Sequence, residues 1–237
     1  MLYSKNMKKY LTWSNLLLVV CLLVITAIAI VFSSLMTWII WLSEVFGILT
    51  TFFSAKGKWI CYIFDLASYA LYIYVCLIER YYGEMILSFI VIIISIISLV
   101  KWKKNQLEDV VEVNWISNKE VAFSYVFGAI ALVLYSVVLY FLNTSLPILN
   151  AIPTIFYLLG YYYGARRSML QFYSFIAYEV GFVLIWTVTA INGQIDSLIF
   201  LIGGICEIIF LIIGVLNWRK IKRKQDLNKI SEHLEDN

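Results

Sequence analysis

The stretch Ala55-Lys56-Gly57-Lys58 separates two long apolar runs, and 110 residues later the stretch Ala165-Arg166-Arg167-Ser168 separates two more. In each half of the chain a glycine then interrupts the next apolar run, and a tryptophan followed by basic residues ends the last one. These marks are Gly83-Glu84 and Gly193-Gln194, again 110 residues apart, followed by Trp102-Lys103-Lys104 and Trp218-Arg219-Lys220. Because both copies run in the same direction, the sequence predicts two parallel repeats of three helices each, an architecture found in membrane transporters.

The composition places this chain in a membrane. Hydrophobic residues make up 62% and charged residues 14% of its 237 residues, whereas about a quarter of the residues of a soluble domain are charged. Apolar runs of about 18 to 22 residues, each long enough to cross roughly 30 Å of hydrocarbon, follow one another along the chain. We therefore predict an all-α polytopic membrane protein with about eight transmembrane helices. The predicted spans are 14–32, 36–54, 59–78, 85–102, 120–142, 147–164, 169–190 and 196–217.

The repeat divides these helices into a core with a 3+1+3 plan, preceded by one N-terminal helix. A loop at about 105–118 and a linker helix join the two triplets. The predicted units are an N-terminal tail and extra helix (1–34), a first three-helix repeat (35–104), a loop and linker helix (105–143), a second three-helix repeat (144–220) and a polar tail (221–237).

Basic residues gather in alternate turns between the spans. They occupy the N-terminal tail, the turns at Lys56–Lys58, Lys103–Lys104 and Arg166–Arg167, and the segment Arg219–Lys224, whereas the opposite turns contain only Arg80. Since loops rich in lysine and arginine stay on the cytoplasmic side, both termini are predicted to be cytoplasmic. The net charge of +3 is explained by these loops and the lipid bilayer, and we expect no nucleic-acid partner. Tryptophans near span ends, Trp102 and Trp218 among them, are predicted to lie at the membrane interfaces.

Motifs for catalysis or cofactor binding are absent from the sequence, which has no phosphate-binding glycine loop, no dinucleotide-binding turn and no catalytic triad or zinc pattern. The only histidine, His233, lies in the polar tail. Four cysteines lie inside predicted spans without the spacing of metal ligands, so we interpret them as small buried hydrophobic residues. They are Cys21, Cys61, Cys76 and Cys206. We predict that the chain is not an enzyme and binds no cofactor or metal.

Four carboxyl side chains fall inside predicted spans, where an ionisable residue is costly and marks a candidate site. Glu179 and Asp65 lie in the middle of their helices, and Glu207 lies deep in the last span. Glu44 lies nearer the end of its span and can also reach the headgroups. For Glu179 we expect either contact with a substrate or a role in proton coupling. The alternative for each residue is a protonated carboxyl that bonds to a neighbouring helix.

The helix around Glu179 carries the candidate binding face. Phe172, Phe175 and Glu179 are spaced i, i+3 and i+7, which places them on one side of a helix. Aromatic rings next to a carboxyl suit a flat, partly polar ligand, and a cationic ring would gain a cation–π interaction. The alternative is that the phenylalanines only pack or face lipid. Neighbouring candidates are Gln171, Tyr178 and Tyr161–Tyr163.

The order and spacing of several short motifs resemble those of the PnuC-type nicotinamide riboside transporters, bacterial relatives of the SWEET sugar facilitators. The motifs are the Ala55–Lys58 turn, Tyr72 and Tyr74, Tyr82–Met85, Leu146-Pro147 with Asn150-Ala151 and Thr154, the Arg166-Arg167 turn, and Gly214 before Trp218. The spacing matches without gaps over about 55–88 and 146–190, and the resemblance covers most of the chain. It implies a 3+1+3 fold in a bacterial inner membrane, a homotrimer, and facilitated diffusion of a substrate that a cytoplasmic kinase then phosphorylates.

The chain departs from this family at the expected substrate site. Members typically carry Trp-x-x-Trp followed four residues on by asparagine or aspartate, where this chain has Phe172, Phe175 and Glu179. Asp65, a candidate because of its depth in the membrane, and four positions that the resemblance places at the site complete the predicted substrate site. These four are Cys61, Ser68 and Ser88, where members usually carry amides, and Asn150, where an aspartate is common.

We therefore predict a facilitator for a small aromatic vitamin or nucleoside similar to nicotinamide riboside, which alternates access by rocking helices two to four against helices six to eight. Thiamine, riboflavin and deoxynucleosides, which other members carry, stay open as substrates. Two alternatives are a vitamin-binding membrane subunit of a larger importer with a separate ATPase, and a degenerate relative that no longer transports.

Overall fold

The computed structural model describes the fold of residues 2–78, 82–141, 147–191 and 198–235. Within these ranges it contains eight helices and one two-stranded antiparallel hairpin. The elements are α1 (Leu2–Phe32), α2 (Leu35–Ala55), α3 (Cys61–Ile78), α4 (Tyr82–Lys104), β1 (Gln106–Leu107), β2 (Val110–Val111), α5 (Asn118–Phe141), α6 (Pro147–Ala165), α7 (Leu170–Ile191) and α8 (Leu198–Glu235).

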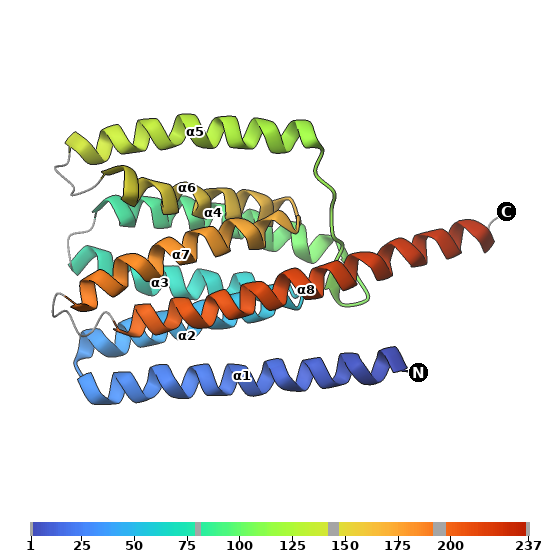
Figure 1. The fold of residues 1–237 in the computed structure, drawn as a ribbon, viewed down its shortest axis with the longest axis horizontal. Coiled ribbons are helices and arrows are strands. Elements are labelled where there is room, and N and C mark those ends of the chain that lie inside the picture. Colours follow the sequence, from blue (N-terminus) through green and yellow to red (C-terminus); the bar gives the residue numbers. More distant parts are fainter. Residues whose placement is uncertain (1, 79–81, 142–146, 192–197, 236–237) are drawn as a thin grey trace.

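The helices lie side by side in one bundle, with both chain termini at the same end (Figure 1). Helices α2, α3 and α4 form one repeat and α6, α7 and α8 form the other. The repeats interlock, because α2 packs against α8 and α4 packs against α6. Helix α1 packs outside α2 and α8, and α5 packs against α6. This arrangement confirms the predicted all-α polytopic fold with a 3+1+3 core and one additional N-terminal helix.

Seven of the described helices are long and apolar enough to cross a membrane, and each overlaps a predicted span. The remaining predicted span corresponds to α6, which is rich in tyrosine and packs in the same bundle against α4, α5 and α7. Three of its rings are buried there, those of Tyr157, Tyr161 and Tyr163. Helix α6 therefore brings polar aromatic side chains into the interior of the bundle.

The two turns that open the sequence repeat adopt the same backbone geometry. Gly57 has a φ of 68° and Arg167 a φ of 57°, so both lie in the left-handed region that glycine enters most easily. The segment between the repeats binds both turns. The N–H of Val111 donates to the carbonyl of Gly57 at 2.9 Å, and the N–H of Asn114 donates to the carbonyl of Arg167 at 3.0 Å. The linker thus holds the two repeats at equivalent positions.

The loop predicted at 105–118 contains a short hairpin. Strand β1 pairs with β2 across the two-residue turn Glu108-Asp109, in which both residues have positive φ angles, 48° and 64°. Two consecutive left-handed residues form the type of turn that follows the natural twist of paired strands. The side chain of Gln225 in α8 then accepts a hydrogen bond from the N–H of Val113 and donates one to the carbonyl of Val111, both at 3.0 Å.

Helix α8 extends well beyond its predicted span. The sequence predicts a polar tail from residue 221, and the structure shows that this tail continues the same helix to Glu235. Lys229 pairs with Glu112 of the linker at 2.7 Å, and Arg167 lies 3.4 Å from the same carboxylate. The hydrogen bond from Lys229 and the nearby charge of Arg167 lower the pKa of Glu112. The tail therefore braces the linker against the second repeat.

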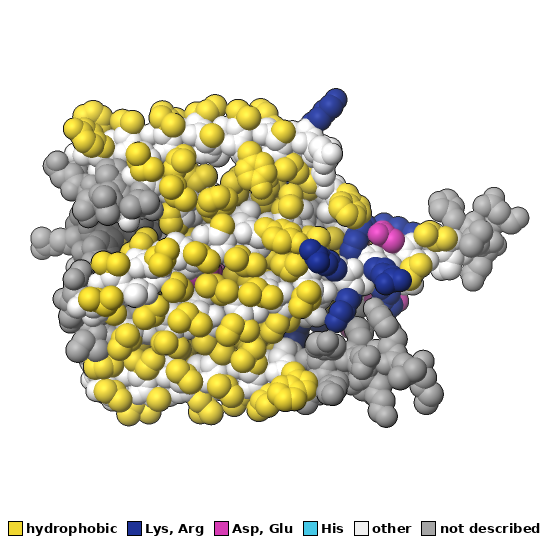
Figure 2. Space-filling model, in the orientation of Figure 1, with side chains coloured by type: hydrophobic (Ala, Val, Ile, Leu, Met, Phe, Trp, Pro, Cys, Tyr) yellow, Lys and Arg dark blue, Asp and Glu magenta, His cyan; other side chains and the backbone are white. Residues whose placement is uncertain are grey.

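Basic side chains gather at the end of the bundle that carries the termini, while apolar side chains cover the visible face of the helices (Figure 2). An apolar surface around the helices is what contact with hydrocarbon requires. We call the charged end the basic end, and its residues include Lys56, Lys103, Arg166, Arg219 and Lys224.

Gly57→Ala is expected to lower the free energy of unfolding by about 1–2 kcal/mol, the strain of an L residue in the left-handed region. The added Cβ would meet no close neighbour, since the nearest atom, Cδ1 of Ile221, is 3.4 Å away. Gly57→Asn should lose less, because asparagine enters this region more readily. Thermal unfolding of the purified protein in detergent measures both variants, and equal losses would contradict backbone strain as the cause.

Candidate functional site

Two tryptophans connect the repeats near the basic end. The indole N–H of Trp102, in α4, donates to the carbonyl of Gly164 in α6 at 2.8 Å. The indole N–H of Trp218, in α8, donates to the carbonyl of Ser54 in α2 at 2.9 Å. Each bond runs from the third helix of one repeat to the first helix of the other. Since Ser54 and Gly164 are 110 residues apart, the two crossed bonds are related by the repeat itself.

The rings around this pair close the basic end of the bundle. Trp102 and Trp218 are 0% exposed, and their ring centroids are 5.4 Å apart. Tyr62 meets the edge of Trp102 at 5.0 Å, and Phe172 meets Trp218 at 5.2 Å. We call Tyr62, Trp102, Phe172 and Trp218 the aromatic plug. The two tryptophans predicted at the membrane interface instead bond inside the bundle, where their N–H groups find carbonyl partners.

A second group of rings lies deeper in the bundle, and we call it the aromatic cage. Its members are Tyr69 from α3, Tyr157 and Tyr161 from α6, and Phe175 and Tyr178 from α7. Tyr157 is central, with its ring centroid 4.5 Å from that of Tyr178 and 4.9 Å from that of Tyr161. Phe175 and Tyr69 complete the group at 6.2 Å and 6.4 Å from Tyr157. Both repeats therefore supply rings to one site.

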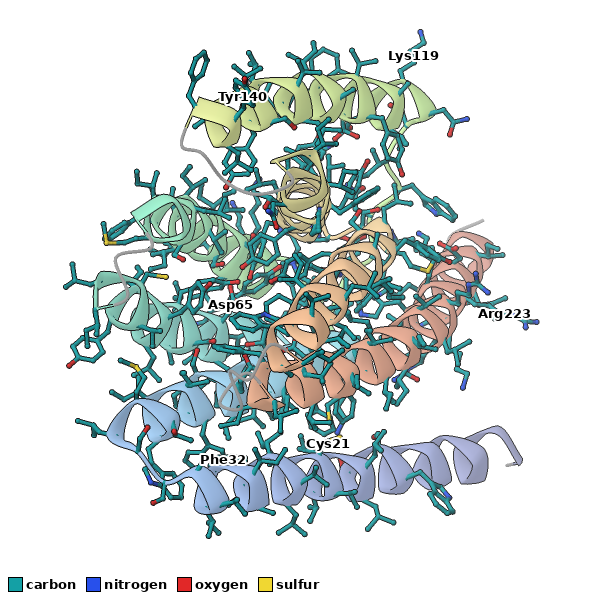
Figure 3. The ribbon with its side chains drawn as sticks, turned by 60° about the vertical axis from the view of Figure 1, so that its left-hand side comes forward. Cys21, Phe32, Asp65, Lys119, Tyr140 and Arg223 are labelled. Carbon is teal, nitrogen blue, oxygen red and sulfur yellow. The ribbon has the colours of Figure 1, made fainter. Side chains whose placement is uncertain are left out.

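Asp65 is an acidic group beside the cage. It lies in α3 in the interior of the bundle (Figure 3), where it is 3% exposed. Its carboxylate accepts a hydrogen bond from the hydroxyl of Tyr161 at 2.7 Å and another from the hydroxyl of Ser95 in α4. Among the residues that the structure describes, no lysine or arginine forms an ion pair with it. Asp65 is therefore held by neutral donors, one from each repeat.

A small cavity lies between Asp65 and the aromatic plug. Its volume is about 30 Å³, which is room for a water molecule and far less than a nucleoside needs. Residues from both repeats line it, including Cys61, Tyr161, Gln171 and Phe175. Gln171 is 1% exposed, and its Nε2 has no hydrogen-bond partner within the described part of the chain. An unused donor of this kind suits a polar group of a ligand or a water molecule.

Three further carboxyls flank the cage, and we call them the carboxyl triad: Glu44 of α2, Glu179 of α7 and Glu207 of α8. Glu179 is 6% exposed, and its carboxyl lies close to that of Glu207. Glu44 lies within electrostatic range of both. Tyr157 in the cage lies within range of Asp65, Glu179 and Glu207. In the described ranges, no group of histidine, cysteine or acidic side chains has the geometry of a metal site.

Comparison with known proteins identifies the family. The sequence profile described as "Nicotinamide mononucleotide transporter" matches residues 37–222, which include almost all of α2 and continue into α8. The chain belongs to this transporter family. It is also similar to the nicotinamide riboside transporter PnuC of Neisseria mucosa, with 24% identity over 195 residues, which are 79% of this chain and 74% of that protein.

The fold matches a solved structure described as "Crystal structure of the Vitamin B3 transporter PnuC". The TM-score is 0.77 at 21% sequence identity, over 90% of this chain and 92% of the other. These findings confirm the predicted resemblance to PnuC-type proteins. As a member of the nicotinamide mononucleotide transporter family, the chain is a multi-pass membrane transporter. Helix α1 lies outside the residues matched by the family profile.

The structure brings four of the predicted site residues together. Phe175 belongs to the cage, and Asp65 and Glu179 flank it. Cys61 is 1% exposed and lines the small cavity beside Asp65. These residues come from α3 and α7, the middle helices of the two repeats.

The other four predicted site residues are neither members of the cage nor in the lining of the small cavity. Phe172 belongs to the aromatic plug, where it contacts Trp218. The hydroxyl of Ser68 bonds to the carbonyl of Ser43 at 3.0 Å, in the contact between α2 and α3. Ser88 is 2% exposed in α4, and the carbonyl of Asn150 accepts a hydrogen bond from Thr154 within α6.

Sequence analysis does not single out Tyr157 or Ser95, although both are central to the site. Tyr157 precedes Tyr161 by four residues, so the two rings share one face of α6. This spacing is the feature of the sequence that could have identified Tyr157 as a site residue. Ser95 is one of several serines in the apolar α4, and only its contact with Asp65 distinguishes it.

Proposed function

We propose that this transporter carries a small molecule similar to nicotinamide riboside, whose pyridinium ring is flat and positively charged. The observation that carries the proposal is the position of Tyr157, in contact with other cage rings and within electrostatic range of Asp65 and Glu179. Aromatic faces attract a cation, and carboxylates in a poorly hydrated interior attract it further. The similar proteins are named as transporters of nicotinamide compounds, which supports the same choice of substrate.

Binding would require the repeats to move. The cavity beside Asp65 holds about 30 Å³, so the cage has to open before a nucleoside fits. We infer alternating access, in which α2–α4 rock against α6–α8. The crossed bonds of Trp102 and Trp218 join the repeats at the basic end, so this end opens only when both bonds break.

We place the basic end in the cytoplasm, because loops rich in lysine and arginine remain on that side. Both termini are then cytoplasmic, in a bacterial inner membrane. By the family resemblance, a cytoplasmic kinase traps the substrate by phosphorylation, and three copies of the chain associate. We assign the chain the role of a carrier and no catalytic activity.

Uptake by the purified protein in liposomes tests this function. Labelled nicotinamide riboside should equilibrate across vesicles that contain only this chain, without ATP, and unlabelled nicotinamide riboside should compete. A vitamin-binding subunit of a larger importer would raise its thermal stability with ligand but would not transport. A degenerate relative would do neither. Thiamine, riboflavin and deoxynucleosides as competitors measure the specificity.

Tyr161→Phe is expected to reduce uptake at limiting substrate by about tenfold or more, because Asp65 loses a buried hydrogen bond of roughly 1.5–3 kcal/mol. Tyr163→Phe is the matched control, since the hydroxyl of Tyr163 bonds to Ser124 at 2.6 Å, in the contact between α5 and α6. Both variants should lose some thermal stability, and only Tyr161→Phe should lose uptake. Equal losses of uptake would contradict the assignment of Tyr161 to the site.

A further inference from the structure

Two members of the carboxyl triad, Glu44 and Glu207, lie in the contact between α2 and α8, where glycines leave room for them. The carboxyl of Glu44 in α2 lies directly against Gly203 of α8. The carboxyl of Glu207 in α8 lies against Gly47 of α2, where an added Cβ would stand 2.6 Å from its Oε1. Each helix therefore has a glycine at the position where the other helix places a carboxyl side chain. Two helices that pack in this reciprocal way hold their carboxyls at fixed positions inside the bundle.

Glu179 gives an independent sign that a ligand belongs at the triad. Its side chain is 6% exposed, and its Oε2 has no hydrogen-bond donor among the described residues. This oxygen lies 3.2 Å from the position of a Cβ on Gly204, in the helix that carries Glu207. A buried carboxylate oxygen without a donor is unfavourable. A proton or a cation at this oxygen would satisfy it.

The groups around the triad supply no positive charge. The titratable side chains within electrostatic range of it are Asp65 from α3, Tyr157 from α6 and Cys206 from α8, and Cys21 from α1 packs in the same cluster as Cys206. In the described part of the chain, no lysine, arginine or histidine is among the groups that act on the three carboxyls. The charge of the triad is therefore balanced by protons or by a ligand.

Elementary electrostatics favours protons in the empty site. Neighbouring carboxyls in a poorly hydrated place cannot all be ionised, because their negative charges repel one another. Glu179 and Glu207 are close neighbours, and a hydrogen bond between them would also require a proton, because a carboxylate has acceptors and no donor. A cationic ring in the cage would supply the same positive charge. A proton and a cationic ring should therefore compete for the same carboxylates.

We propose that the carboxyl triad is a proton site, which holds a proton while the cage is empty and releases it when a cationic ring enters. The proposal rests on the proposed function. As one positive charge enters with the ring, one proton leaves Glu179 or Glu207 for the adjacent solution, so the charge of the site is unchanged. When the empty carrier returns with its proton, one cation has been exchanged for one proton across the membrane.

Calorimetric titration of the full chain with nicotinamide riboside, in two buffers of different ionisation enthalpy, counts the protons released. We expect about one proton per ligand, and an affinity that rises about tenfold per pH unit over the range in which the triad titrates. Reduced nicotinamide riboside, which has a similar shape and no ring charge, should bind without releasing a proton.

Variants locate the proton. Glu179→Gln and Glu207→Gln should each remove the proton release and flatten the pH dependence of binding. Glu108→Gln is the matched control, because Glu108 is an exposed acid in the hairpin turn, and it should change neither. Gly47→Ala displaces the carboxyl of Glu207 without removing it. If a glutamine variant does not fold, proton release and the pH dependence of binding are measured on Gly47→Ala instead, and both should decrease.

Transport provides the second measurement. In liposomes, an acidic interior should accelerate the uptake of nicotinamide riboside, and a sodium gradient should have no effect. Binding without proton release, pH dependence that persists in both glutamine variants, or stimulation by sodium alone would each overturn the proton site while leaving the proposed function intact. Failure of nicotinamide riboside to bind at any pH would contradict the proposed function itself.

Discussion

Trp102→Phe and Trp218→Phe are each expected to lower the free energy of unfolding by about 1–2 kcal/mol, because each removes one donor and leaves a buried carbonyl unpaired. With both bonds absent, the basic end keeps only the ring contacts of the plug and the contacts of the linker. The double variant should therefore open there more often. Cys61, which is 1% exposed and packs in the same cluster as both tryptophans, should react with a maleimide about 10- to 100-fold faster, the effect of losing roughly 1.4–2.8 kcal/mol.

Trp115→Phe is the control for this prediction. Trp115 is 73% exposed, so its replacement should change neither stability nor the reactivity of Cys61. The other three cysteines are first replaced by alanine, and the reagent is added from the side of the basic end. Unchanged reactivity of Cys61 in the double tryptophan variant would show that the aromatic plug is not the barrier at this end.

The sequence predicts the scaffold well because the scaffold is periodic. The matched turns at Gly57 and Arg167, the apolar runs and the alternating basic loops are all local features, and the structure contains the repeats that they indicate. The crossed bonds of Trp102 and Trp218 were not predictable from the same marks. A tryptophan beside lysines at the end of a span is typical of a membrane interface, and only the packing of α4 on α6 shows that Trp102 points inward.

The candidate site was predicted in part, and the reason lies in the pitch of a helix. Phe172, Phe175 and Glu179 share one face of α7, as their spacing indicates. One turn of a helix rises about 5.4 Å, so the same face passes different neighbours at different depths. Phe172 meets Trp218, whereas Phe175 meets Tyr157 and Tyr161. Periodicity specifies a face, and the depth along that face depends on the partner helices.

Phe175→Ala and Phe172→Ala should therefore have different effects. The ring of Phe175 lies 5.2 Å from that of Tyr161 in the cage. Its loss should weaken the binding of nicotinamide riboside about 5- to 100-fold, since stacking of an aromatic side chain on a base contributes about 1–3 kcal/mol. Phe172 is 0% exposed, and its loss should lower the free energy of unfolding by about 3–5 kcal/mol with little change in the affinity of the folded protein.

Glycines that contact the rings of Phe175 and Phe172 allow the two rings to be shifted instead of removed. A Cβ on Gly160 would stand 2.6 Å from the ring of Phe175, so Gly160→Ala shifts this ring without removing it and should weaken binding. Gly214 lies against the ring of Phe172 in the same way, so Gly214→Ala should instead lower thermal stability. If Gly214→Ala weakened binding as strongly as Gly160→Ala, Phe172 would also contact the substrate. The plug and the cage would then form one continuous binding surface, which a ligand reaches from the basic end.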